Sequence, residues 1–272
     1  MILYKYMPTD RFFNNFKLRF TPANDLNDPR ELVPEIRLRN AHDYMSDITN
    51  RNFTSAYFKL LFEHPEFSVE EAFARCVAAA KQIEGNFDPV AKAQEIFDRF
   101  MRVTNTHVGV LSLTESPDNE LMWAHYAASN SGFAIGFDSE NPFFQPQPGE
   151  PKTCGELMNV IYSDTRPVVF VDPGKLEIPK EIFFTKTTKW SYEREWRMIK
   201  YLDPAHEVAL PEGKIIHLFE VPTNALVEVI FGTKATLDTI TEIRKKLLLL
   251  QPNVSFKRMK FEYSKGVVIE DI

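Results

Sequence analysis

The sequence predicts an α+β fold built on a mixed, largely antiparallel sheet with a helical layer or insertion. Helical periodicity dominates residues 65–101, whereas short β-branched and aromatic runs dominate after His107. These runs do not alternate regularly with helices, as a doubly wound parallel sheet would require. We therefore expect a single domain over residues 1–272, with residues 30–104 as a mainly helical insertion within it.

The elements follow in order along the chain. Two short strands at 2–6 and 17–20 are each ended by a proline. Ser68 and Glu71 have the spacing of a capping box, and Asp88-Pro89 opens a second helix. The remaining elements are a strand at 108–113, a helix at 118–128, strands at 133–137, 160–162, 196–201, 215–221 and 226–231, a helix at 237–250 and a strand at 254–259, with a loop at 142–155.

Composition narrows the class of protein. The chain has 272 residues, of which 44% are hydrophobic and 13% aromatic, so it can bury a full core. A net charge of −6 argues against a general nucleic-acid-binding face. Cys76 and Cys154 support neither a disulfide framework nor a zinc cluster, and no apolar run approaches the ~20 residues of a membrane span. No metal site, P-loop or dinucleotide fingerprint is evident, and we expect a cytoplasmic protein.

Two neighbouring segments form the first candidate site. Ser112 and Thr114 end a predicted strand just before a helix, where hydroxyls and unpaired backbone N–H groups can bind a polar ligand. The plainer interpretation is a helix cap at Ser116 or Asp118. The helix itself is apolar nearly all round, which is typical of buried core. His125 is accordingly interpreted as a hydrogen-bonded core histidine in preference to a general base. Its imidazole and the Trp123 ring are still candidates for the wall of a cofactor pocket.

The second candidate site is the run from Trp190 to Arg197. In a strand, Glu193, Glu195 and Arg197 would share one face, because alternate side chains point the same way. Burying two carboxylates and a guanidinium is costly unless they line a cavity or pair with each other. The alternative is a solvated edge strand with surface salt bridges.

Five short blocks, in order from residue 3 to residue 197, resemble a bacterial family known as domain of unknown function 2971. The blocks are Leu3-Tyr4-Lys5-Tyr6, Leu26-Asn27-Asp28-Pro29-Arg30-Glu31, Leu111-Ser112-Leu113-Thr114 with Leu121 to Ala127, Gly132 to Asp138 and Trp190 to Arg197. The family name conveys no reaction.

Three of these elements also resemble ADP-ribosyltransferases, which carry a cationic or aromatic residue in a first strand, hydroxyls ending a second, and Glu-x-Glu in a later strand. Tyr4 and Lys5, Ser112 and Thr114, and Glu193 and Glu195 fall in that order. Lys5 stands where an Arg is usual, and Leu113 separates the hydroxyls. The resemblance implies a split sheet whose cleft binds NAD.

The same resemblance implies roles for these residues. Glu195 would stabilise an oxocarbenium-like centre and Glu193 would orient the acceptor. Tyr126 or Trp123 would stack on a ring of NAD, and Lys5 or Arg197 would meet its pyrophosphate. We therefore expect Glu195 to face a cleft that Ser112, Tyr126 and Lys5 also line.

The function expected from this resemblance is an ADP-ribosyltransferase-like enzyme that uses NAD to modify a macromolecule, of the kind that serves as a toxin or anti-phage effector. One alternative is a non-catalytic sensor in which Trp123, Tyr126, Trp190 and Trp196 form an aromatic pocket for a nucleotide or peptide. A third is a nuclease that uses Lys186 and Glu193 with a metal. Finally, the turn at Asn27-Asp28-Pro29 is expected to close over the site as a loop carrying Arg30.

Overall fold

The computed structural model describes residues 1–149 and 154–272, so residues 150–153 of the predicted loop lie outside the described residues. The chain divides into two compact units. The first consists of residues 1–32, 103–165 and 183–272, and the second of residues 33–102 and 166–182. The single domain with an insertion at residues 30–104 stays a prediction.

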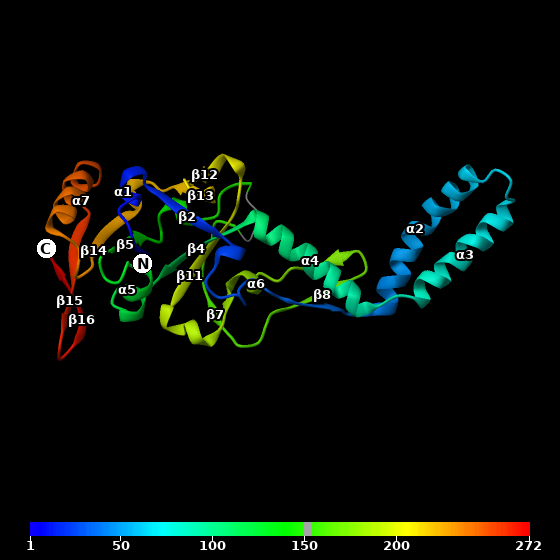
Figure 1. The fold of residues 1–272 in the computed structure, drawn as a ribbon, viewed down its shortest axis with the longest axis horizontal. Helices are drawn as coiled ribbons and strands as arrows, with labels where there is room; N and C mark the ends of the chain where they lie inside the picture. Colours follow the sequence, from blue (N-terminus) through cyan, green and yellow to red (C-terminus); the bar gives the residue numbers. More distant parts are fainter. Residues whose placement is uncertain (150–153) are drawn as a thin grey trace. The chain divides into compact units, whose positions relative to one another are not determined.

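The first unit is built on one large sheet, which confirms the predicted α+β class (Figure 1). Its strands run in the order β12, β13, β2, β4, β1, β5, β14, β15, β16. In addition, β11 pairs with β4, and β6 pairs with β11. The bounds are β1 Ile2–Met7, β2 Lys17–Pro22, β4 Val108–Thr114, β5 Phe133–Asp138, β6 Leu157–Asn159, β11 Glu195–Tyr201, β12 Glu207–Ala209, β13 Ile215–Glu220, β14 Leu226–Phe231, β15 Ser255–Glu262 and β16 Gly266–Asp271.

The pairing is mixed and mainly antiparallel, as expected. Within the large sheet β14 and β15 run parallel, and β7 (Ile161–Tyr162) and β10 (Thr185–Lys186) form a separate parallel pair. The predicted strand at 160–162 corresponds to β7, and Val160 lies between β6 and β7. The helical elements are α1 Phe12–Asn15, α5 Glu120–Tyr126, α7 Leu237–Leu250, η1 Ala23–Asp25, η2 Pro142–Phe144, η3 Thr188–Glu193, η4 Pro204–His206 and η5 Thr223–Ala225.

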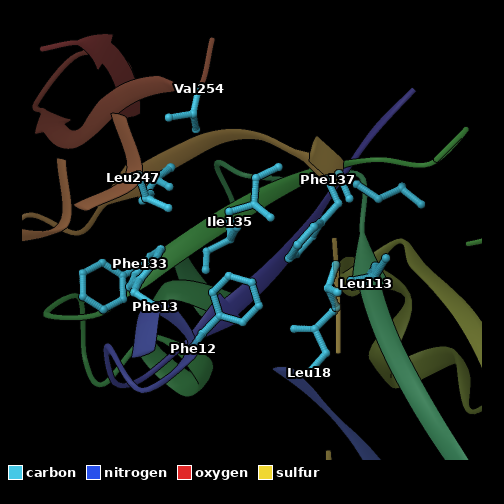
Figure 2. Close-up of a cluster of buried hydrophobic side chains, with 14 of the residues drawn as sticks. Phe12, Phe13, Leu18, Leu113, Phe133, Ile135, Phe137, Leu247 and Val254 are labelled. Atoms are coloured by element: carbon cyan, nitrogen blue, oxygen red, sulfur yellow. The ribbon is translucent and has the colours of Figure 1, made fainter. Parts of the chain in front are cut away.

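The two faces of the sheet bury different clusters because strand side chains alternate. Phe133, Ile135 and Phe137 of β5 face the main core (Figure 2). That core also contains Leu247 of α7, and Figure 1 shows α7 beside β14. Ala134 faces the opposite cluster, which contains α5. Successive residues of a strand therefore face different sides of the sheet, and only those that point away from the packed clusters can line a site.

The sheet is split along one edge of β4. On its outer edge β4 pairs with β11 over its whole length, from Val108 to Thr114. On its other edge it pairs with β2 only at Gly109 and Val110, and with β1 only at Thr114. β1 and β2 therefore diverge beside the middle of β4, which creates the opening that the candidate site uses.

The second unit contains α2 (Ala41–Glu63) and α3 (Val69–Gly85), which lie side by side as a helical hairpin (Figure 1). Ser68 and Glu71 form the predicted capping box at the start of α3. A three-stranded sheet of β3 (Glu35–Leu38), β8 (Val168–Asp172) and β9 (Lys175–Leu176) completes this unit. Two of the points at which the sequence passes from one unit to the other fall within helices, namely α4 (Pro89–His107) and α6 (Glu181–Phe184).

Candidate functional site

A pocket of about 240 Å³ opens in the split of the sheet. β1 contributes Tyr4 and Lys5 to its lining, and β4 contributes Ser112. Its further lining residues are Tyr6, Arg19, Thr21, Asp25, Leu26, Asn27, Glu31, Leu113, Met122, Tyr126, Lys186, Glu193 and Glu195. The expectation that Glu195 and Ser112 converge on one cleft with Tyr126 and Lys5 is therefore confirmed.

A sharp turn brings the Glu-x-Glu pair to this pocket. Glu195 and Arg197 lie on one face of β11, as predicted, but Glu193 ends a 3-10 helix and is not in the strand. Arg194 between the two glutamates adopts a left-handed conformation with φ 45°. That conformation is strained for a residue with a side chain, and such strain is often found at functional sites. The turn, not strand alternation, directs Glu193 into the cluster.

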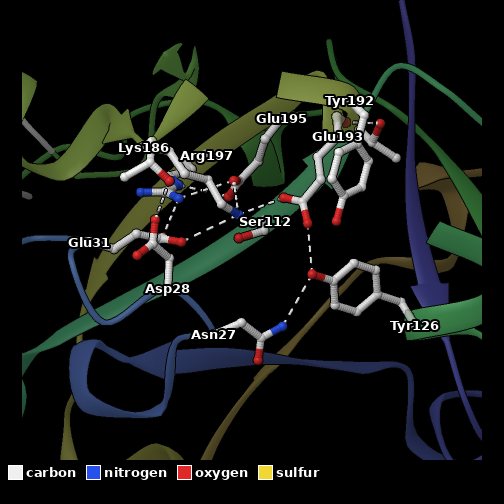
Figure 3. Close-up of polar contacts among 12 residues, drawn as sticks. Asn27, Asp28, Glu31, Ser112, Tyr126, Lys186, Tyr192, Glu193, Glu195 and Arg197 are labelled. Carbon is white, nitrogen blue, oxygen red and sulfur yellow. Dashed lines mark hydrogen bonds and ion pairs between the residues drawn. The ribbon is translucent and has the colours of Figure 1, made fainter. Parts of the chain in front are cut away.

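Five buried charges form one network (Figure 3). The Nζ atom of Lys186 lies 2.5 Å from Glu193, 3.0 Å from Glu195 and 3.3 Å from Glu31. Arg197 donates two hydrogen bonds to Glu195, at 2.7 and 3.0 Å, and one to Glu31. Three carboxylates thus face two cations, so the network carries one surplus negative charge when every group is ionised.

The pairing separates the pKa values of the two glutamates that share Arg197. Burial opposes ionisation of Glu195, but Arg197 and Lys186 outweigh it and lower its pKa to about 2. For Glu31, burial prevails over the same two cations and raises the pKa. The carboxylates in turn raise the pKa of Lys186 and that of Arg197. Glu195 is therefore a fixed anion, and Lys186 is a fixed cation.

The Asn27-Asp28-Pro29 loop reaches the pocket. Asn27 donates a hydrogen bond of 3.1 Å to the Tyr126 hydroxyl, which itself donates one of 2.7 Å to Glu193 (Figure 3). Asp28 is anchored by the Thr187 hydroxyl at 2.8 Å. Arg30 instead points away to the backbone oxygen of Asp164 at 2.9 Å. The loop thus borders the site, but Arg30 does not line the pocket.

Lys5 differs from the other cations of the site. Its Nζ donates a 2.9 Å hydrogen bond to the backbone oxygen of Ser112, across the split from β1 to β4. Burial lowers its pKa to about 8, although Glu195 and Glu193 partly oppose this. Lys5 is therefore a positively charged donor at pH 7 that loses its proton near pH 8.

Four residues predicted to bind the cofactor lie elsewhere. Thr114 is buried and donates to the backbone oxygen of Glu193. Trp123 is completely buried against Tyr6, with ring centroids 5.1 Å apart. Arg197 is also completely buried behind Glu195, so it cannot reach a pyrophosphate. His125 is exposed and does not line the pocket, which corrects both its predicted pocket role and its interpretation as a core histidine.

The aromatic pocket of the alternative hypothesis does not form. Trp196 donates to Glu115 at 2.8 Å and packs against the main core. The Trp190 ring is tilted against that of Tyr192, with a centroid separation of 6.1 Å. Of the four aromatic residues proposed for it, only Tyr126 is among the described residues that line the pocket.

Sequence reasoning assigned no role to Glu31. It is buried, it pairs with both cations of the network, and its partner Arg197 is 166 residues away in the chain. Glu31 ends the Leu26–Glu31 block quoted for the family resemblance, which was the one available signal. Arg19 and Asp25, which pair with each other at the rim of the pocket, had no such signal.

No group of three or more His, Cys, Asp and Glu side chains among residues 1–149 and 154–272 is arranged to hold a metal ion. Where three carboxylates do meet, the ammonium group of Lys186 lies among them. No helix formed by the described residues has the length and apolarity that crossing a membrane demands.

Comparison with known proteins gives one match. A family model described as "Protein of unknown function (DUF2971)" matches residues 122–198. The match includes Tyr126, Lys186 and the Glu-x-Glu segment, but not Lys5 or Ser112. No curated protein and no solved structure matches the chain.

Proposed function

We propose that the pocket in the split sheet binds NAD and that the protein transfers ADP-ribose from it to a macromolecule. The observation that carries this proposal is the meeting of Lys5, Ser112 and Glu195 at one pocket, from three strands that are far apart in sequence. These are the elements through which the sequence resembles ADP-ribosyltransferases. A toxin or anti-phage effector is the biological setting that we propose for this activity.

The size of the pocket limits which part of NAD it can enclose. Sites that bury a whole drug-sized ligand usually have volumes of ~300–1,000 Å³, whereas this pocket has about 240 Å³. It therefore suits one end of the dinucleotide, the nicotinamide ribose, with the rest extending outwards. Tyr126 and Tyr4 offer aromatic surface to the nicotinamide ring, and Lys5 offers positive charge to the phosphates.

The charge of the pocket wall fits cleavage of the glycosidic bond. That bond breaks with its electron pair leaving on nicotinamide, and positive charge develops on the ribose carbon. The carboxylates of Glu193 and Glu195, which line the pocket, can stabilise this centre. A nucleophile of the acceptor then bonds to the ribose carbon and gives up its proton.

The test is to incubate the full chain with labelled NAD and cell lysate, then measure nicotinamide release and label on macromolecules. Glu195→Gln should lower turnover by about 10²-fold or more, because it keeps the shape but removes the fixed charge. Glu115→Gln is the matched control, since Glu115 lies outside the pocket and bonds Arg194 and Trp196. No consumption of NAD by wild type with any lysate would refute the proposal.

One observation favours a second candidate, a nucleotide-binding module without turnover. All three carboxylates of the network already have cationic partners, as expected of a structural cluster that shapes a pocket. This candidate predicts NAD binding to wild type without nicotinamide release, and only a modest change of affinity in Glu195→Gln.

A further inference from the structure

The pocket contains two lysines in opposite environments. The Nζ atom of Lys186 lies within 3.3 Å of three carboxylates, which leaves it no free donor. Lys5, by contrast, has one described acceptor, the backbone oxygen of Ser112. In the part of the chain that the structure describes, no carboxylate lies within 4.0 Å of its Nζ. Both lysines line the same cavity.

Burial lowers the pKa of the Lys5 amine. Glu195 and Glu193 oppose this effect, and the nearby cations Arg19 and Lys186, whose influence is smaller, add to it. The resulting pKa of about 8 makes about half of the Lys5 side chains neutral amines at pH 8. Lys186 stays protonated there because its carboxylate partners raise its pKa. A desolvated lysine beside other cations is an established arrangement for nucleophilic catalysis.

We propose that Lys5 is a nucleophilic amine that captures a small aldehyde or ketone in this pocket as an imine. The Nζ lone pair attacks the carbonyl carbon and forms a carbinolamine. The carbinolamine then expels its oxygen as water, which carries away the two protons of the original amine. Amine and carbonyl compound thus become imine and water, and no oxidant, reductant or metal is consumed. This capture does not depend on NAD or on the transferase activity proposed above.

The geometry supports attack by this amine and not by its neighbour. The hydrogen bond to the Ser112 oxygen uses one N–H of Lys5 and holds the nitrogen at the opening between β1 and β4. In the neutral amine, the lone pair and the one remaining hydrogen are then available to the cavity. The volume of about 240 Å³ restricts the substrate to a compact carbonyl compound. Lys186 remains an ammonium whose three donors face carboxylates, so it has no lone pair with which to attack the carbonyl carbon.

The test uses glycolaldehyde as the probe with sodium cyanoborohydride, which reduces the imine to a stable secondary amine. The wild-type chain is labelled between pH 6 and pH 9 without NAD, and each lysine is quantified by peptide mass mapping. An ordinary lysine with a pKa of ~10.4 is neutral in about one molecule in 250 at pH 8. Lys5 therefore has on the order of a hundredfold larger neutral fraction, and we expect labelling at least ~tenfold faster than at exposed Lys81.

Two comparisons make the result decisive. Lys186 is the internal control in the same pocket, and it should remain unlabelled. Lys5→Arg keeps the positive charge but cannot form the imine. The fast labelling should therefore be absent from this variant, whereas the labelling of its other lysines should match that of wild type. Fast labelling with a midpoint near pH 8 in a protein that consumes no NAD would support this inference and reject the proposed function. Labelling of wild-type Lys5 no faster than that of Lys81 would overturn the inference, whatever the folding of the variant.

Discussion

Arg197→Met should lower the free energy of unfolding of the first unit by about 3–5 kcal/mol. The Arg197 side chain is 0% exposed and pairs with Glu195 and Glu31, whose side chains are each 2% exposed. Methionine fills much of the same space but leaves both carboxylates to share Lys186. Removing one partner of a buried ion pair typically costs ~3–5 kcal/mol, because a charge is left buried without compensation.

The lowered pKa of Glu195 gives a second indication of how much Arg197 stabilises the network. Its lowering from 4.5 to about 2 corresponds to a net stabilisation of the charged carboxylate of about 3 kcal/mol that remains after the opposing effect of burial. Arg197 is the largest of the influences that lower it, ahead of Lys186. Loss of the guanidinium therefore removes the largest favourable influence on the Glu195 carboxylate, in the direction expected from its burial.

Urea denaturation at pH 7 followed by tryptophan fluorescence would measure this loss. Trp123, Trp190 and Trp196 are the three tryptophans of the chain and all belong to the first unit, so the signal reports on that unit. Arg194→Met is the control, because Arg194 is 61% exposed and its ion pair with Glu115 should contribute less than ~1 kcal/mol. Equal, small losses in the two variants would refute the reasoning that the network is held by buried pairing.

Three further predictions concern pH, helix capping and packing. Because the pKa of Glu195 is lowered, its contribution is present above about pH 4.5 and lost as the pH falls towards 2, so an acid titration of stability should be flatter in Glu195→Gln. Ser68→Ala removes the capping box and should cost about 1 kcal/mol, seen as faster amide exchange in the first turn of α3. Gly109→Ala would place Cβ 2.4 Å from Leu202 Cδ2 and 2.9 Å from Phe20 Cβ, so calorimetry should show a loss of about 1–3 kcal/mol.

Periodicity predicted the elements whose apolar residues face one way. The predicted helix at 237–250 matches α7, with Ile240, Ile243 and Leu247 buried on one side. In contrast, α2 was not identified as a separate helix. Its apolar residues do not gather on one face, and Phe58 and Phe62 are 63% and 90% exposed. A helix without an apolar stripe gives no periodic signal.

The predicted helix at 118–128 was too long at both ends. Asn119 caps α5, and residues 128–130 adopt positive φ, which ends the helix before them. The aromatic side chains of this helix were also assigned to the wrong surroundings. α5 packs Trp123 onto Tyr6 of β1, so the indole fills the core and only Tyr126 reaches the pocket. Sequence alone does not determine which side of an apolar helix meets the sheet.

The candidate site was predictable where strand geometry determines it. Glu195 and Arg197 are two residues apart in a strand and therefore share a face. Glu193 lies beside them only because Arg194 adopts a left-handed conformation, and no residue type at this turn predicts that conformation. The contact of Glu31 with Arg197 depends on the tertiary fold, so no local pattern predicts it.

Hydrogen–deuterium exchange of the full chain, with and without NAD, tests the central claim that the split-sheet pocket is the binding site. NAD should slow amide exchange in β1, in the loop at 24–31, and from η3 into β11, because these segments border the pocket. The α2–α3 hairpin serves as the internal reference, and its exchange should not change. Protection confined to other segments, or none at NAD concentrations that saturate known NAD-binding proteins, would contradict the account.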